Sequence, residues 1–144
     1  MKFWDSSALI PLFFEEGHSE TVQAIAKDDG NMIVWWATIL ECRSAIARLR
    51  REGTLSNAEE DQLLDLVKDL AGSWTEISPG ENVRNIALRL LSVHPLRAAD
   101  SLQLAAALIW ADLPAQNSEF VSLDQRLREA ARKEGFSVLP KAAM

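Results

Sequence analysis

Four acidic residues that lie far apart in the chain stand where a predicted strand ends or a predicted helix begins. They are Asp5, Glu41, Asp100 and Asp124. The carboxyl ends of parallel strands meet at one edge of an open α/β sheet, and such sheets bind ligands there. Two carboxylates about 4–6 Å apart repel each other by roughly 3–4 kcal/mol at an effective dielectric of 20. Four of them gathered at one point would therefore require protonation or a bound cation.

The residue types indicate a hard cation rather than zinc. The two histidines, His18 and His94, are isolated in the sequence, and no cluster of His and Cys is present. Zinc sites are usually built from those residue types, so zinc is not expected. A site made only of oxygen ligands suits Mg²⁺, with Mn²⁺ as a substitute. One or two such ions can activate water and stabilise the leaving oxygen in phosphoester cleavage.

Each acid also has a purely structural interpretation. Glu41 could complete a capping box with Thr38, Asp100 and Asp124 could be first-turn acids stabilised by a helix dipole, and Asp5 could be an N-cap. The joint pattern favours a shared site over four separate caps. Asp5 and Asp100 in particular lie in apolar sequence, where an unpaired carboxylate is costly.

Five short predicted strands alternate with helices along the chain. The strands are predicted at 2–5, 32–36, 74–77, 119–123 and 136–139, and the helices at 18–26, 38–51, 56–70, 81–91, 98–113 and 124–133. This alternation predicts an α/β fold, a three-layer α/β/α sandwich with a mostly parallel central sheet of about five strands. All four acids would then lie at the same edge of the sheet.

Helix signals support two of these starts and one apolar face. Thr38 with Glu41 and Ser56 with Glu59 both match the capping box, in which an N-cap hydroxyl and a Glu three residues later satisfy each other's backbone donors. In the helix 98–113, one face is predicted from helical periodicity. Its members are Leu102, Ala105, Ala106, Ile109 and Trp110.

Composition places further bounds on the protein. The 144 residues, without a repeat or a linker, predict a single domain over 1–144. A hydrophobic content of 48% argues against disorder. The net charge of −6 argues against a generic nucleic-acid coat. It does not argue against a nuclease, because metal-binding carboxylates are themselves negative.

The sequence also predicts a cellular location. A single cysteine, Cys42, cannot form an internal disulfide, which indicates a reducing compartment. No long apolar signal region precedes Asp5, and the longest apolar run, from Leu104 to Ala111, is shorter than the ~20 residues that cross a bilayer. We therefore expect a soluble cytoplasmic protein without membrane association.

Four segments, in order, resemble the motifs of PIN-domain nucleases. The first is Asp5-Ser6-Ser7-Ala8-Leu9 and the second runs from Thr38 to Leu49 with Glu41 in its first turn. The third runs from Leu96 to Ala105 around Asp100, and the fourth from Phe120 to Leu127 around Asp124, followed by Ala130-Ala131 and Gly135. Order and spacing match over essentially the whole chain. The compact length most resembles the VapC toxins of toxin–antitoxin pairs.

This resemblance implies a Mg²⁺-dependent endoribonuclease toxin that cleaves RNA and is neutralised by a cognate antitoxin. Asp5, Asp100 and Asp124 would hold the metal, and Glu41 would bind metal or orient the attacking water. Ser6 and Ser122 would support the metal or its waters. A homodimer is also expected by resemblance. The chain departs from the family at Ser122, where Thr is frequent, and at Ser101 and Gln103, where Ala and His are frequent; these changes concern specificity more than activity.

Basic and aromatic residues outside the motifs leave alternatives open. Arg97 could contact a phosphate or hold the Asp100 carboxylate. The basic helix end could compensate the helix dipole, or could contact phosphate or a partner; it comprises Arg43, Arg48, Arg50 and Arg51. Phe13 and Phe14, beside Glu15-Glu16, could mark a groove for a partner, and the family implies an antitoxin peptide there.

Two other classes of protein remain as alternatives. A receiver-like or phosphatase-like signalling domain would explain an acid after the first strand, and Lys141 follows the last one. However, no acid ends the third strand at Ile77-Ser78, and Asp5-Ser6-Ser7 lacks the second acid of an aspartyl phosphatase. The other alternative is a non-catalytic binding module whose acids only cap helices.

Overall fold

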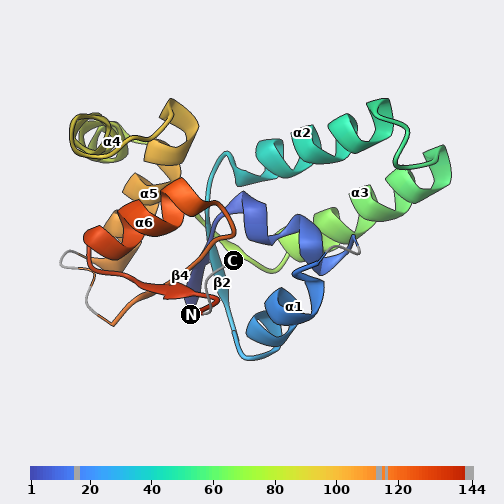
Figure 1. Ribbon diagram of the computed structural model, residues 1–144, viewed down its shortest axis with the longest axis horizontal. Helices are drawn as coiled ribbons and strands as arrows, with labels where there is room; N and C mark the ends of the chain where they lie inside the picture. The colour runs from blue at the N-terminus through green and yellow to red at the C-terminus, as the bar shows by residue number, and fades with distance from the viewer. Residues whose placement is uncertain (15–16, 113–114, 116, 142–144) are drawn as a thin grey trace.

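A single all-parallel sheet forms the centre of the protein (Figure 1). The computed structural model describes residues 1–14, 17–112, 115 and 117–141. Within them five strands pair in parallel in the order β3-β2-β1-β4-β5. The strands are β1 (Lys2–Trp4), β2 (Met32–Trp35), β3 (Thr75–Ile77), β4 (Glu119–Val121) and β5 (Ser137–Leu139). The sequence predicted a mostly parallel sheet of about five strands, and this prediction is confirmed.

Helices cover both faces of the sheet, which gives the predicted three layers (Figure 1). One face carries the helices of the first half of the chain, α1 (Ser19–Lys27), α2 (Thr38–Arg51) and α3 (Asn57–Ala71), with the short 3-10 helices η1 (Ser6–Ala8) and η2 (Ile10–Leu12). The other carries α4 (Glu81–Val93), α5 (Ala98–Ala111) and α6 (Gln125–Lys133). None of these helices combines the length and the hydrophobicity needed to span a membrane.

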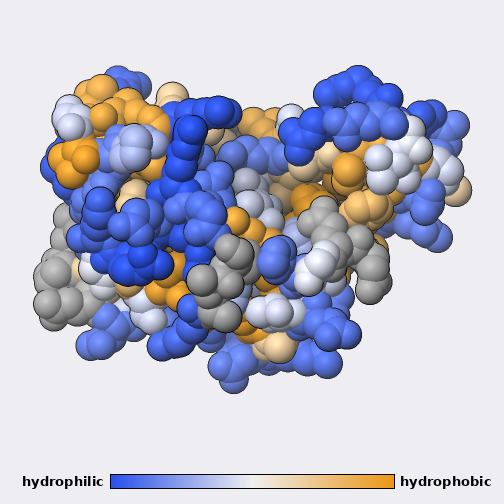
Figure 2. Space-filling model, viewed as in Figure 1, coloured by the Kyte–Doolittle hydropathy of each residue, from blue (hydrophilic) through white to orange (hydrophobic). Residues whose placement is uncertain are grey.

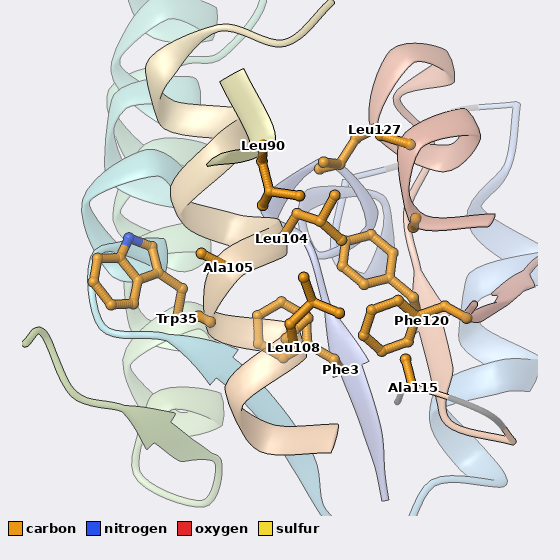
Figure 3. Close-up of a cluster of buried hydrophobic side chains, with 14 of the residues drawn as sticks. Phe3, Trp35, Leu90, Leu104, Ala105, Leu108, Ala115, Phe120 and Leu127 are labelled. Carbon is orange, nitrogen blue, oxygen red and sulfur yellow. The ribbon is translucent and has the colours of Figure 1, made fainter. Parts of the chain in front are cut away.

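Alternating strand residues divide the hydrophobic core into two parts, because successive side chains point to opposite faces of a sheet. Phe3 and Phe120 face α5, and their rings stack with centroids 5.5 Å apart (Figure 3). The next residues along the same strands, Trp4 and Val121, face the helices of the first half of the chain. All four side chains are fully buried. This alternation fixes the register of β1 against β4.

The apolar face predicted for α5 is only partly right. Ala105 and Ala106 are fully buried, but Leu102, Ile109 and Trp110 are only partly so. The whole segment Leu104–Leu108 is buried. The helix packs against β2, α4 and α6 at once, so burial extends round most of its circumference rather than along one stripe.

The order of the strands reverses between β1 and β4. From β1 the chain proceeds to β2 and β3 on one side, and it then returns to β4 and β5 on the other. An open α/β sheet leaves a crevice at such a switch point, outside the carboxyl ends of its strands. Asp5 directly follows β1, and Asp124 follows β4 after two residues. The fold therefore directs two of the predicted acids to its natural ligand crevice.

Candidate active site

The four acids predicted from the sequence lie around one cavity of about 550 Å³. Asp5 comes from the end of β1, Glu41 from α2, Asp100 from α5 and Asp124 from the start of α6. Their carboxylates influence one another electrostatically, because Asp5 and Asp100 each raise the pKa of Glu41, and Asp124 raises the pKa of both Asp5 and Asp100. Four segments far apart in sequence thus meet at one negatively charged site.

Asp5 is the most deeply buried of the four, with 4% of its surface exposed. Burial raises the pKa of its carboxyl above the ordinary value, and hydrogen bonds from Ser7 and Ser122 oppose that rise. The Ser7 and Ser122 hydroxyls both donate to Asp5 Oδ2, at 2.5 and 2.9 Å. The Ser6 hydroxyl lies farther away, 3.5 Å from Oδ1. Asp5 stands at the N-cap position of η1, but its side chain makes no capping bond there, so helix capping does not account for this carboxylate.

Glu41 turns away from the start of its own helix. The predicted capping box is wrong, because α2 begins at Thr38 itself and its N-cap, Ala37, makes no side-chain bond. Glu41 Oε1 instead accepts a 2.6 Å hydrogen bond from Gln103 Nε2, which also donates to Thr38 Oγ1 at 3.0 Å. Burial is the largest effect on the Glu41 carboxyl and raises its pKa, while hydrogen bonds from Gln103 and Ser6 lower it.

Asp100 and Asp124 serve their helices and the cavity together. Asp100 Oδ2 accepts from the Arg97 main-chain N–H at 3.3 Å, and Asp124 Oδ1 accepts from the Leu127 N–H at 3.0 Å. Asp124 is therefore the N-cap of α6 rather than a residue of its first turn. Burial raises the pKa of Asp100 most, and the Arg97 hydrogen bond opposes that effect. The structural interpretation holds for these two acids without excluding a role in the cavity.

Two arginines bring positive charge to this acidic cavity. Arg97 and Arg48 both line it. Of the basic helix end predicted on α2, Arg48 is the member that reaches the cavity lining; Arg50 instead donates to the Asn57 side chain where α2 connects to α3. Acids at the centre with arginines beside them suit a substrate that carries phosphates.

The donor chemistry of the cavity fits a hydrated hard cation. Among the described residues no three His, Cys, Asp or Glu side chains converge closely enough to form a cage of protein ligands. The acids surround the cavity instead, and each has an oxygen held by a serine, an amide or a main-chain N–H. Mg²⁺ keeps several waters and commonly binds only one or two carboxylates. Burial and mutual repulsion raise the pKa of Asp5, Glu41 and Asp100. A bound cation would oppose both effects, because it stabilises the charged carboxylates.

The family of this chain follows from a family model for the PIN domain, which matches residues 2–133. The chain belongs to the PIN-domain family. Two curated relatives, named Ribonuclease VapC45 and Ribonuclease VapC49, both from Mycobacterium tuberculosis, are each 28% identical to it over 141 residues. Each alignment covers 96% of this chain and 94% of the relative.

Solved structures share the PIN fold at lower sequence identity. A toxin-antitoxin complex from Klebsiella pneumoniae matches with a TM-score of 0.68 and 13% identity over all of both chains. FitAcB from Neisseria gonorrhoeae matches with a TM-score of 0.70 and 18% identity over 98% of both. PAE2754 from Pyrobaculum aerophilum matches with a TM-score of 0.61 and 20% identity, over 94% of this chain and 81% of the other.

Sequence reasoning missed the roles of Ser7 and Arg128 in this PIN domain, and it noted Gln103 only as a departure from the family motif. Ser7 contacts Asp5 more closely than Ser6 does, and its hydroxyl also accepts from the Leu123 N–H at 2.9 Å. Gln103 holds Glu41. Arg128 is buried and donates to the carbonyl oxygens of Ser122, at 2.9 Å, and of Pro140, at 2.7 Å. Gln103 had a signal, since it lies three residues after Asp100 on a predicted helix and so on a neighbouring part of its surface.

Cys42, adjacent to Glu41, is a packing residue. It is buried among apolar side chains of the core that contains Trp4 and Ile46. Burial, with the nearby Glu41 and Asp5 carboxylates, raises the pKa of its thiol to about 12. A thiol with that pKa stays protonated and unreactive at neutral pH.

Proposed function

We propose that this PIN domain is a Mg²⁺-dependent endoribonuclease, the toxin of a toxin–antitoxin pair. One observation carries the proposal: acids from four separate segments surround a single cavity at the switch point of a parallel sheet. Family membership and the relatives named ribonucleases support RNA as the substrate. Mn²⁺ would substitute for Mg²⁺, because both are octahedral cations that prefer oxygen ligands.

In this proposal Asp5, Asp100 and Asp124 hold one or two Mg²⁺ ions. Bound Mg²⁺ would lower the pKa of water and neutralise charge that develops on the phosphate. Glu41, with one oxygen fixed by Gln103, holds metal or orients the attacking water. Ser122 keeps the Asp5 carboxylate in place, and Ser6 supports the neighbouring waters.

The arginines of the cavity would position the RNA backbone. Arg97 directly precedes α5, the helix of Asp100, and Arg48 lies on α2, the helix of Glu41; both line the cavity. Guanidinium groups bind phosphate oxygens in pairs of hydrogen bonds. With a phosphodiester held there, water adds to phosphorus and the bond to the 3′ oxygen breaks. The products are a 5′-phosphate and, once the leaving oxygen is protonated, a 3′-hydroxyl.

A protein partner and a second copy of the chain belong to the same proposal. A groove of about 420 Å³ lies beside η2, α1 and the end of α3, and its lining includes Leu12, Phe13, Ala26 and Met32. Such a groove would receive an apolar segment of the antitoxin; Glu15-Glu16, predicted beside it, lie outside the described residues. The solved relative from Klebsiella, described as a toxin-antitoxin complex, supports an antitoxin as the partner.

The surface of α4 supports a homodimer. Leu88, Leu91 and Val93 are exposed there, and Figure 2 shows hydrophobic surface over this helix. Leu88 and Leu91 are three residues apart, so they lie on the same side of the helix. Exposed apolar surface gathered in this way is characteristic of protein contacts.

We also propose that residues 1–144 form a single domain, because both halves of the chain share one sheet, and that the protein is cytoplasmic.

The two alternatives from the sequence have less support. The receiver-like order of strands is 2-1-3-4-5, whereas this sheet has β3 and β2 on one side of β1. A non-catalytic module whose acids only cap helices would not account for Asp5 and Glu41, whose side chains make no capping bond.

The test is cleavage of single-stranded RNA by purified protein in Mg²⁺ and in EDTA. Asp5→Asn and Asp100→Asn should each lower cleavage more than about 100-fold, because losing a supporting residue of a metal site alone costs 10–100-fold. Asp65→Asn, at an exposed acid of α3, is the matched control and should cleave like the wild type. Cleavage that persists in EDTA, or in both site variants, would refute the proposal.

A further inference from the structure

Gln103 joins two elements of the site from a fully buried position. Its side chain is 1% exposed, and it projects from α5 toward the first turn of α2. One nitrogen, Nε2, donates to Glu41 Oε1 at 2.6 Å and to Thr38 Oγ1 at 3.0 Å. Both hydrogens of the amide group thus serve residues that lie one turn apart on another helix.

The other end of the same amide is unsatisfied. Gln103 Oε1 is buried and has no hydrogen-bond partner among the described residues. Reversing the amide would turn this oxygen toward Glu41 and set two acceptors against each other. A buried acceptor without a partner costs stability, so packing alone does not favour glutamine here. The arrangement is explained if the amide is required to hold a carboxylate at Glu41.

The position of Gln103 also connects two of the four acids. Asp100 lies three residues earlier on α5, and residues at this spacing are neighbours on a helix surface. The same helix therefore presents one acid directly and fixes a second acid, Glu41, through Gln103. Glu41 has no such partner on its own helix, since α2 starts without a side-chain cap.

We propose that Gln103 is a positioning residue that fixes the carboxylate of Glu41 toward the cavity for catalysis. This inference rests on the proposed nuclease function. Gln103 does not touch RNA or the reacting atoms. Its effect is to hold the Glu41 side chain in one conformer. Without Gln103, Glu41 would have to reach that conformer again in each turnover. Loss of Gln103 should accordingly reduce kcat more than it raises KM, because RNA binding depends on other groups.

The decisive variant is Gln103→Met, which keeps the length and flexibility of the side chain and removes the amide. We expect kcat to fall about 10–100-fold, the usual range for residues that support a site from behind. We expect KM for RNA to change less than about threefold, since no RNA contact is lost. The thermal midpoint should fall only modestly, because losing the unsatisfied Oε1 offsets part of the cost of leaving Glu41 and Thr38 without their donor.

A second measurement is independent of activity. In crystals of metal-free Gln103→Met protein the Glu41 side chain should leave the conformer it has in the wild type or become disordered. Thr38→Val removes the second acceptor of Gln103 and leaves the bond to Glu41 available, so its kcat should fall less than that of Gln103→Met. If Gln103→Met does not fold, Gln103→His takes its place, because histidine retains an N–H donor. An unchanged kcat and an unchanged Glu41 conformer in Gln103→His would then support the proposal.

The controls separate this inference from the proposed function. Leu104→Met, at the next buried position of α5, changes packing without contacting an acid and should behave as the wild type. If wild type cleaves, Asp5→Asn does not, and Gln103→Met cleaves normally with Glu41 unmoved, then the inference is overturned while the nuclease function stands. If the wild type does not cleave RNA with any divalent cation, both fail.

Discussion

Replacing Asp5 by Asn should stabilise the protein in the absence of metal. The Asp5 carboxylate is buried beside Asp124, and both effects raise its pKa. The amide can place its oxygen where Oδ2 now lies, so Ser7 and Ser122 can still donate to it. Its nitrogen would then lie near the Ser6 hydroxyl, which is 3.5 Å from Oδ1. The substitution removes a buried charge and retains the local hydrogen bonds.

The size of this effect follows from two opposing contributions. Hydrogen bonds to a charged acceptor contribute about 1.5–3 kcal/mol each and those to a neutral one about 0.5–1.5, so two weakened bonds cost roughly 2 kcal/mol. Burying an unpaired ion costs several kcal/mol, which the amide avoids. The net gain is about 1–3 kcal/mol, and at roughly 3 °C per kcal/mol for a domain of this size the midpoint should rise about 3–9 °C.

The raised pKa of Asp5 also predicts the direction in which folding stability changes with pH. Because the pKa of Asp5 is raised in the folded state, the native protein binds this proton more tightly than the unfolded chain does. Stability is then highest below the unfolded pKa, near 3.8, and falls as pH rises toward the folded pKa. Wild-type stability in EDTA should decline with rising pH more steeply than that of Asp5→Asn, and the advantage of the variant should disappear at acidic pH.

Differential scanning calorimetry in EDTA and in excess Mg²⁺ provides the assay, with Asp65→Asn as control. Mg²⁺ at about 100 times its Kd should stabilise the wild type by about 2.7 kcal/mol and Asp5→Asn by much less. The reasoning would be refuted if Asp5→Asn melted below the wild type in EDTA at neutral pH while keeping the full stabilisation by Mg²⁺. That result would mean the carboxylate is a structural anchor.

Three further outcomes follow from the structure. Ser56→Ala removes the hydroxyl that accepts from the Glu59 N–H at 3.1 Å in the capping box of α3, and should lower stability by about 1 kcal/mol without changing the rate of RNA cleavage. Cys42, with its pKa raised to about 12, should react with a thiol reagent only on unfolding; fast reaction of the native protein would contradict its packing role. Leu91→Glu should shift a dimer to monomer in light scattering, whereas Leu66→Glu, at an exposed leucine of α3, should not.

The sequence predicted that the four acids lie together, because the order of strands and helices largely determines where their ends lie. Asp5 and Asp124 follow neighbouring strands, and a parallel sheet brings such positions to one edge. Glu41 and Asp100 lie in first turns of helices, which begin near the same edge. Element order and helix starts are encoded locally, so the arrangement needed no knowledge of side-chain contacts.

The two capping boxes show where local patterns fail. Ser56 with Glu59 forms the reciprocal bonds of the motif at an exposed helix start. Thr38 with Glu41 has the same pattern, yet both side chains bind Gln103, more than sixty residues away. A partner from another helix competes with the local bond, and its identity cannot be read from the motif.

Side-chain support and burial were the least predictable features. Ser7 rather than Ser6 anchors Asp5 closely, because the tight 3-10 turn of η1 places the second serine against the carboxylate. The buried run from Leu104 to Leu108 likewise reflects packing of α5 against several elements. An argument from periodicity assumes that a helix is covered on one face only, whereas a central helix such as α5 is covered on several.

Location of a bound cation tests the central claim most directly. Crystals soaked in Mn²⁺ should show an anomalous-scattering peak in the cavity, within bonding distance of Asp5 and of Asp100 or Asp124, with waters completing its coordination. The same soak of Asp5→Asn crystals should show the peak lost or greatly weakened. A peak outside the cavity, or none at a Mn²⁺ concentration that supports RNA cleavage, would contradict the assignment of these acids as one cation site.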